Sequence, residues 1–294
     1  MRRLPIGLVC VALWLLPGQA RAQQATPPPQ PAEPQQTPPP PPDPQAAPEH
    51  ADPDVRVDPL QPDFTLAALP TTLRMPVHKL AFRVTHRFTR PIDQGDFGDF
   101  LDDFFGFDSA ARIGLELRYG LLPGTQVGVH RTSDRTIQIF GQQSILSERH
   151  NKPFGLDFIA TLEGENNLQQ HFQTVLGAAL SRNLGRHLAL YAEPLVAVNS
   201  NGSSFGDNDT FFVGLGGRLR VRPSTYLTAE ISPRLAGFQP GAALTSFALE
   251  HRAGGHLFQI NVSNGFGTTL AQIGRGGIDY DTWFIGFNIA RKFF

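Results

Sequence analysis

The sequence has almost no cysteine: Cys10 is the only one among 294 residues. It lies in an apolar stretch, Ile6 to Leu16, that follows two arginines and precedes the small residues of Ala20-Arg21-Ala22. This arrangement predicts a secretory signal peptide over residues 1–22. The exported chain is then expected to hold no cysteine. Disulfides, thiolate catalysis and cysteine metal sites are excluded together.

The sequence also lacks a surplus of basic charge and, beyond its N-terminus, long apolar runs. The formal net charge is −1, and a nucleic-acid partner would call for a clear basic surplus, so none is expected. Beyond residue 22 no run reaches the roughly 18 apolar residues of a membrane-spanning helix. A membrane protein without such helices must be a closed β-barrel, because only closure satisfies every backbone polar group in lipid.

Proline is concentrated near the N-terminus, where residues 23–62 hold 15 of the 26 prolines. Such a segment cannot bury a core, and its composition predicts an extended, polyproline-like chain. We divide the chain into a signal peptide (1–22), a proline-rich disordered periplasmic tether (23–68) and a barrel (69–294). The tether is interpreted as an inert spacer, with attachment to the cell wall or to a periplasmic protein as the alternative.

From residue 79 onward, alternating segments are separated by turn residues. One face is apolar, as at Leu80, Phe82 and Val84, and the other is charged. The pattern predicts an all-β fold: a closed, antiparallel, up-and-down transmembrane barrel of about 12 strands, with lipid outside and a polar lumen. A soluble lipocalin-like barrel or a sandwich, with the apolar face inward, is the alternative. The expected strands are 80–89, 109–119, 124–131, 135–146, 153–162, 169–181, 187–198, 210–222, 225–232, 242–250, 256–263 and 282–293.

The connections between these segments differ in length. The three longest, 90–108, 199–209 and 264–281, are all odd-numbered, whereas the even-numbered connections 120–123, 182–186, 223–224 and 251–255 are brief. Outer-membrane barrels have short periplasmic turns and longer external loops. We therefore expect a Sec-exported protein of the Gram-negative bacterial outer membrane with both termini in the periplasm.

The C-terminal strand has period two and ends in aromatic residues. Trp283 and Phe287 share one face, Phe293 continues it, and Phe294 falls on the face of small and polar residues. The segment resembles the last strand of bacterial outer-membrane barrels, in which a terminal Phe is part of the insertion signal. The resemblance implies two partners, outer-membrane lipid and the barrel-insertion machinery.

Several short segments together resemble an uncharacterised family of bacterial outer-membrane β-barrels, known as a domain of unknown function. The resemblance implies a barrel and its compartment, and supplies no activity, substrate or catalytic residue. It covers most of residues 69–291 and rests on Leu69-Pro-Thr-Thr-Leu-Arg-Met-Pro76, Thr85-His-Arg-Phe88, Asp103-Phe-Phe-Gly-Phe-Asp-Ser109, Gly254-Gly-His-Leu-Phe-Gln259 and Gly286-Phe-Asn-Ile-Ala-Arg291.

Charged residues on the inner face are the candidates for lumen selectivity. They could form an anion-selective constriction, or arginines and carboxylates could neutralise one another in a blocked interior. Eight strands fill their interior and 16 to 18 leave an aqueous channel, so about twelve strands leave both readings open. The candidates are Arg83, Arg87, Arg112, Glu116, Arg118, Asp157, Glu193, Arg218, Arg220 and Glu230.

The first long loop carries phenylalanines at helical spacing with aspartates on the other face. A short helix is predicted there, packed over the rim or plugging the mouth of the barrel. A calcium site among the aspartates is less favoured, because the oxygen spacing of a calcium loop is missing. The residues of this rim or plug helix are Asp96, Phe97, Phe100, Leu101, Phe104 and Phe105.

No pattern in the chain predicts a catalytic residue, a metal site or a cofactor. The histidines lack the spacing of a metal pair. Ser263 resembles the serine segment of outer-membrane phospholipases, but Asn261 stands where the general base would be. We expect a non-enzyme: a narrow passive channel for small polar or anionic solutes. A structural or partner-binding barrel with a blocked lumen is the alternative, and a lipid-modifying enzyme is the least favoured.

Overall fold

The computed structural model describes residues 53–56, 58–94, 110–202 and 208–294. The expected signal peptide, most of the proline-rich segment and the expected rim helix at 96–105 lie outside these described residues. Within them, no helix is both long and apolar enough to span a membrane.

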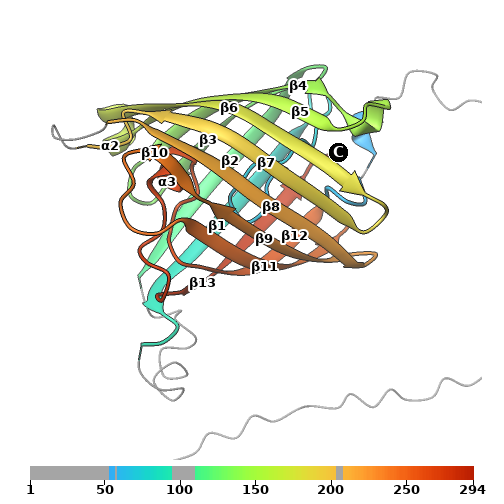
Figure 1. The fold of residues 1–294 in the computed structure, drawn as a ribbon. Helices are drawn as coiled ribbons and strands as arrows, with labels where there is room; N and C mark the ends of the chain where they lie inside the picture. Colours follow the sequence, from blue (N-terminus) through green and yellow to red (C-terminus); the bar gives the residue numbers. More distant parts are fainter. Residues whose placement is uncertain (1–52, 57, 95–109, 203–207) are drawn as a thin grey trace, which may run out of the picture. The chain divides into compact units, whose positions relative to one another are not determined.

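Twelve long strands form one closed antiparallel ring (Figure 1). Each strand pairs with the next in sequence, and β13 pairs with β1 to close the sheet. The short strand β10 follows β9 after Pro233 and pairs with β8, so it extends β9 past an irregularity. The strands are β1 (Leu80–Pro91), β2 (Ala111–Leu122), β3 (Thr125–Thr132), β4 (Ile137–Leu146), β5 (Gly155–Gly164), β6 (Gln170–Leu184), β7 (Leu188–Val198), β8 (Thr210–Arg222), β9 (Thr225–Ser232), β10 (Arg234–Gly237), β11 (Leu244–Ala253), β12 (His256–Ser263) and β13 (Phe284–Lys292).

The apolar face of each strand points outward. Leu115 and Leu215 are 47% and 43% exposed, whereas Arg83 and Glu116, which are cross-strand partners on the inner face, are almost fully buried. A soluble barrel would bury the leucines and expose the charges, so the lipocalin-like alternative is wrong. The barrel presents an apolar belt to its surroundings and keeps its charges inside.

We predict that an arginine placed in the middle of this belt destabilises the folded barrel strongly. Leu115 lies midway along β2, so Leu115→Arg should cost about 2–4 kcal/mol in lipid, whereas Leu122→Arg, at the strand end, should cost about 0–1 kcal/mol. Denaturant titration of barrels folded into phospholipid vesicles measures both free energies of unfolding. Equal costs at the two positions would contradict a membrane-embedded belt.

The connections alternate in length around the ring, with one exception. The strand ends that are joined by residues 92–110, 199–209 and 264–283 lie at one end of the barrel, and the turns 123–124, 185–187, 223–224 and 254–255 lie at the other. We call the second the terminal end, because β1 begins and β13 ends there. The exception is 147–154, a longer connection at the terminal end, which contains the 3-10 helix η3 (Glu148–His150).

Residues 58–76 form a hairpin inside the barrel, which we call the lumen hairpin. Its two arms are joined by hydrogen bonds from Thr71 N to Phe64 O and from Leu66 N to Leu69 O, both 2.8 Å long. Nearly all of its residues are buried, and Ala67 and Leu69 at the tip are completely inaccessible. The expected domain boundary at residue 69 divides this hairpin, because the last part of the supposed tether belongs to the barrel interior.

The lumen hairpin enters and leaves by the terminal end. Its second arm leads directly into β1, and the residues before its first arm contact the exceptional 147–154 connection. Arg149 donates to the carbonyl of Arg56 at 2.7 Å, and Asp54 pairs with Arg74 at 3.1 Å. The extra length of this connection therefore serves to hold the base of the hairpin. In Figure 1 the blue segment and the marked C-terminus lie at this same end.

Candidate functional site

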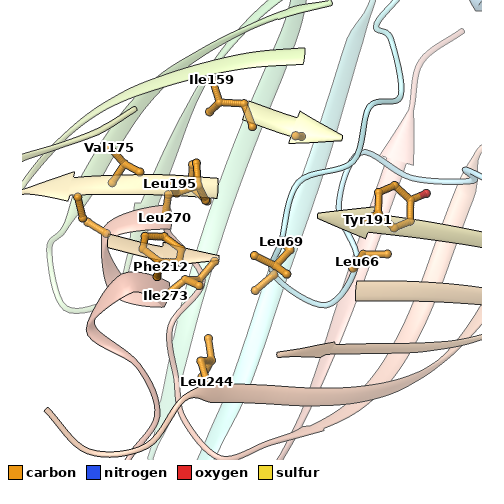
Figure 2. Close-up of a cluster of buried hydrophobic side chains, with 14 of the residues drawn as sticks. Leu66, Leu69, Ile159, Val175, Tyr191, Leu195, Phe212, Leu244, Leu270 and Ile273 are labelled. Carbon is orange, nitrogen blue, oxygen red and sulfur yellow. The ribbon is translucent and has the colours of Figure 1, made fainter. Parts of the chain in front are cut away.

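The candidate functional site is the lumen, which is occupied from both ends. The lumen hairpin fills it from the terminal end. From the opposite end, the loop 264–283 folds inward and carries the helix α3 (Leu270–Arg275). Figure 2 shows Leu66 and Leu69 of the hairpin and Leu270 and Ile273 of α3 in the same interior cluster of apolar side chains. The two insertions share one core.

Helix α3 is fixed in place by its caps and by the barrel wall. The Thr269 side chain accepts from Gln272 N at the start of the helix. The Leu270 N–H donates to the Gln138 side chain at 2.8 Å, and Arg275 pairs with Glu165 at 2.9 Å. Gly274 faces the ring of Phe212 so closely that a Cβ there would lie 2.9 Å from a ring carbon. The helix therefore narrows the lumen at this end.

Little empty space remains between the two insertions. A small cavity of about 30 Å³ lies between the hairpin and α3, and Glu116, His130 and Gln138 are among the groups that line it. This volume holds one or two water molecules. Outside α3, a larger cavity of about 250 Å³ opens among Arg112, Asp134 and Arg275. The interior is thus a packed core with a polar mouth at one end.

The lumen wall holds the hairpin through its main chain. Glu230 on β9 accepts hydrogen bonds from three consecutive N–H groups, those of Ala67, Ala68 and Leu69, at 3.0–3.1 Å. The Ala67 carbonyl accepts from Arg83, Arg87 and Asn288 at 2.6, 3.3 and 2.9 Å. Donors and acceptors from opposite sides of the ring therefore converge on one peptide turn, which satisfies its buried polar groups.

Eight of the ten sequence-predicted lumen residues are buried inside the barrel: Arg83, Arg87, Glu116, Arg118, Asp157, Glu193, Arg218 and Glu230. Arg112 and Arg220 lie near the strand ends instead. Arg112 pairs with Asp134 at 3.3 Å with its side chain 49% exposed, and Arg220 donates to the Pro223 carbonyl. Burial alone raises the pKa of Asp134, but hydrogen bonds from Thr132 and Thr136 and the nearby Arg112 keep it below its ordinary value.

The ion pairs inside the lumen differ from the expected neutralisation. Arg118 pairs with Glu116 at 2.9 Å, as expected. Arg218 pairs with Glu250 at 2.8 Å, a residue that was not among the candidates. Glu230 binds the hairpin backbone, and neither oxygen of Glu193 has a hydrogen-bond partner among the described residues. Some charges of the wall therefore pair with one another, and others, such as Glu230, bind the hairpin backbone.

Several polar residues of the site were not singled out from the sequence. Each lies on the inward face of a strand that was itself correctly predicted, and each contacts the hairpin or a group that binds it. Period-two alternation identifies such positions as lumen-facing. Because the sequence did not predict the hairpin, it could not show that these residues contact it. They are Gln126, Gln142, Tyr226, Glu250, Gln259, Asn288 and Lys292.

The aromatic residues of the C-terminal strand have two environments. Phe287 points outward and stacks on His86 with ring centroids 4.7 Å apart, and Phe293 is half exposed. Trp283 precedes β13 and packs on Phe247. Phe294 instead packs against the hairpin cluster of Phe64, Leu73 and Met75. The last residue therefore contacts the lumen hairpin, consistent with its position on the inward face.

The candidate serine is an ordinary lumen residue. Ser263 accepts a hydrogen bond from Ser246, and Asn261 donates to Gln259. In the described part of the chain, no three His, Cys, Asp or Glu side chains are grouped to hold a metal ion. These contacts give Ser263 a structural role in the wall.

Three solved structures illustrate what the chain is similar to. The NanC porin has a TM-score of 0.48 at 8% identity over 72% of this chain and 98% of its own. The COG4313 outer membrane channel from Pseudomonas putida F1 has a TM-score of 0.46 at 14% identity, and the match covers 74% of this chain and 97% of the channel. A mutant of the Rh. blastica porin has a TM-score of 0.33 at 13% identity, and the match covers 62% of this chain and 55% of the porin.

No curated protein is detectably related to the chain by sequence. A family model described as "membrane bound beta barrel domain (DUF5777)" matches residues 63–293, which include the tip of the lumen hairpin and all strands of the ring. The chain belongs to this family of membrane-bound β-barrels.

Proposed function

We propose that the protein is an outer-membrane channel for small polar solutes that its own lumen hairpin keeps closed. The observation that carries the proposal is the way the hairpin is held. It is bound to the wall by side chain to main chain hydrogen bonds, and within the described residues its strand-like pairing is limited to its own two arms. Its departure would break no strand of the barrel.

The path of the chain also supports a reversible plug. Both arms of the hairpin leave through the terminal end, which we assign to the periplasm. The hairpin can therefore withdraw as one unit, without threading the chain through the lumen. The proline-rich segment 23–57 precedes it, and we propose that a periplasmic protein or the cell wall, acting on this segment, shifts the hairpin outward.

The wall behind the hairpin carries both signs of charge beside apolar side chains such as Tyr191 and Leu195. Arg83, Arg87 and Glu230 bind the hairpin tip, and Arg218 pairs with Glu250. Such a surface is hydrated once it is vacated, and α3 still narrows the opposite end. Mixed charge of this kind favours small polar solutes with weak selectivity between anions and cations rather than a strong anionic preference.

The proposal is tested by replacing residues 58–72 with a glycine–serine linker of the same length. Planar-bilayer recording should show steady conductance for the replaced barrel and rare, brief openings for the unmodified chain. A replaced barrel that is folded, as judged by its heat-modifiable migration, yet conducts no more than the empty bilayer would refute the channel.

A structural barrel with a permanently blocked lumen is the second candidate. The complete burial of the hairpin tip and its shared core with α3 favour it. In that case the barrel anchors the proline-rich segment for a partner, and crosslinked partners should disappear when residues 23–52 are deleted while the bilayer recordings stay silent throughout.

A further inference from the structure

Many contacts between the wall and the lumen hairpin are hydrogen bonds to the main chain of the hairpin. Seven carbonyls between Pro59 and Leu73 accept hydrogen bonds from nine inward side chains of the barrel. They are the carbonyls of Pro59, Pro62, Thr65, Leu66, Ala67, Thr71 and Leu73, which are bound by Tyr226, Lys292, Arg218, Gln259, the Arg83–Arg87–Asn288 group, Gln142 and Gln126 respectively.

The tip of the hairpin shows this main-chain recognition most clearly. Ala67 and Ala68 carry only methyl side chains, yet Glu230 accepts from both of their N–H groups and from that of Leu69. Three donors reach the Ala67 carbonyl on the other side of the turn. Any peptide that forms the same turn offers the same groups, because every residue has a C=O and every residue except proline has an N–H.

Other contacts depend on the identity of a hairpin side chain, and they include the cluster that Phe64, Leu73 and Met75 form with Phe294. Leu66 and Leu69 enter the apolar cluster, the Phe64 ring lies 5.1 Å from the Arg118 guanidinium carbon, and the Thr72 and Ser181 hydroxyls are 2.5 Å apart. They fix the register and favour small residues between two aliphatic ones. The fitting ligand is therefore a short linear peptide that folds into a turn of small residues.

From this geometry we infer that the vacated lumen is a binding site for short peptides, and that peptides are a solute class of the channel. The inference rests on the proposed function, because the site becomes accessible only when the hairpin leaves. The hairpin is then an internal occupant of the peptide site, and a free peptide competes with it for the same wall groups.

The test uses the full chain with a protease site inserted between Val77 and His78, which is folded first and then cut. A fluorescein-labelled peptide with the sequence of residues 58–76 is bound to the lumen, and unlabelled competitors displace it, as measured by fluorescence anisotropy. The competitors are the same peptide, the peptide methylated on the amide nitrogens of positions 67–69, a peptide scrambled outside Leu66–Leu69, and maltohexaose. The barrel in which a linker replaces residues 58–72 serves as a second receptor that requires no exchange of the cut hairpin.

We expect the native peptide to compete, and the scrambled peptide, which loses the apolar contacts of Phe64, Leu73 and Met75, to compete more weakly. The methylated peptide should bind about tenfold to a hundredfold more weakly, because it offers no N–H to Glu230. In Glu230→Ala that penalty of methylation should shrink, as a double-mutant cycle requires. In Glu193→Ala, which removes a buried carboxylate without a hydrogen bond to the hairpin, the penalty should remain.

Each outcome decides one of the two claims. The peptide site is overturned if the methylated peptide or maltohexaose binds as tightly as the native peptide. It is also overturned if no peptide binds to either receptor. Conductance is recorded on the same barrels. Peptide binding without conductance refutes the channel and retains the site, whereas conductance that no peptide blocks retains the channel and overturns the site.

Discussion

Replacing Glu230 with alanine is expected to hold the barrel open. The variant leaves the N–H groups of Ala67, Ala68 and Leu69 without their acceptor in a buried turn. An orphaned buried N–H costs about 1–3 kcal/mol. Even if water replaces most of the lost bonding, a net loss of about 3 kcal/mol shifts the ratio of withdrawn to inserted hairpin about a hundredfold. Planar-bilayer recording should show this as a corresponding rise in open probability.

The matched control is Glu193→Ala. Glu193 is equally buried in the lumen wall, but neither of its oxygens has a hydrogen-bond partner in the described structure. Its removal should leave the open probability close to that of the unmodified chain. If both variants open the barrel equally, the effect comes from loss of lumen charge, and the role assigned to Glu230 is wrong.

A disulfide between the hairpin and β6 should silence the open Glu230→Ala barrel. The Thr72 and Ser181 hydroxyl oxygens are 2.5 Å apart, which brings their Cβ atoms roughly within disulfide reach. The only natural cysteine, Cys10, lies in the predicted signal peptide. Thr72→Cys with Ser181→Cys should therefore abolish conductance under oxidising conditions, and a reductant should restore it fully.

The control for this disulfide places the second cysteine at the next residue of β6. The side chain of Arg182 is 55% exposed on the outer face, so Thr72→Cys with Arg182→Cys should form no disulfide and should conduct with or without reductant. Openings of the oxidised Thr72–Ser181 pair, with the disulfide verified by mass spectrometry, would show that solutes pass without movement of the hairpin.

The barrel itself was predictable from the sequence. Period-two alternation identified all twelve strands of the ring, and the ranges of β8, β9 and β12 agree with the expected ones residue for residue. The reason is physical: lipid on one side and a polar interior on the other force every strand to alternate, so each carries the full signal by itself. The family resemblance over residues 69–291 is confirmed by the match over residues 63–293.

The lumen hairpin was not predictable in the same way. Residues 58–76 contain Pro59, Pro62, Pro70 and Pro76, and their composition resembles that of the preceding tether. The hairpin has almost no sheet pairing of its own, and Glu230, which binds its tip, lies more than 160 positions away in the sequence. A segment held by side chains of the barrel strands leaves no periodic signal of its own. For the same reason the sequence could predict that Glu230 faces the lumen, but not that it binds the main chain of the hairpin.

Access of a thiol reagent to the hairpin tests the central claim most directly. Thr65 is 4% exposed and its hydroxyl has no hydrogen-bond partner among the described residues, so Thr65→Cys should fit without disturbance. In the folded barrel, a membrane-impermeant maleimide should modify this cysteine far more slowly than it modifies Arg186→Cys in an exposed turn, and Glu230→Ala should speed the reaction. Modification at the same rate at positions 65 and 186 would contradict a hairpin buried in the lumen.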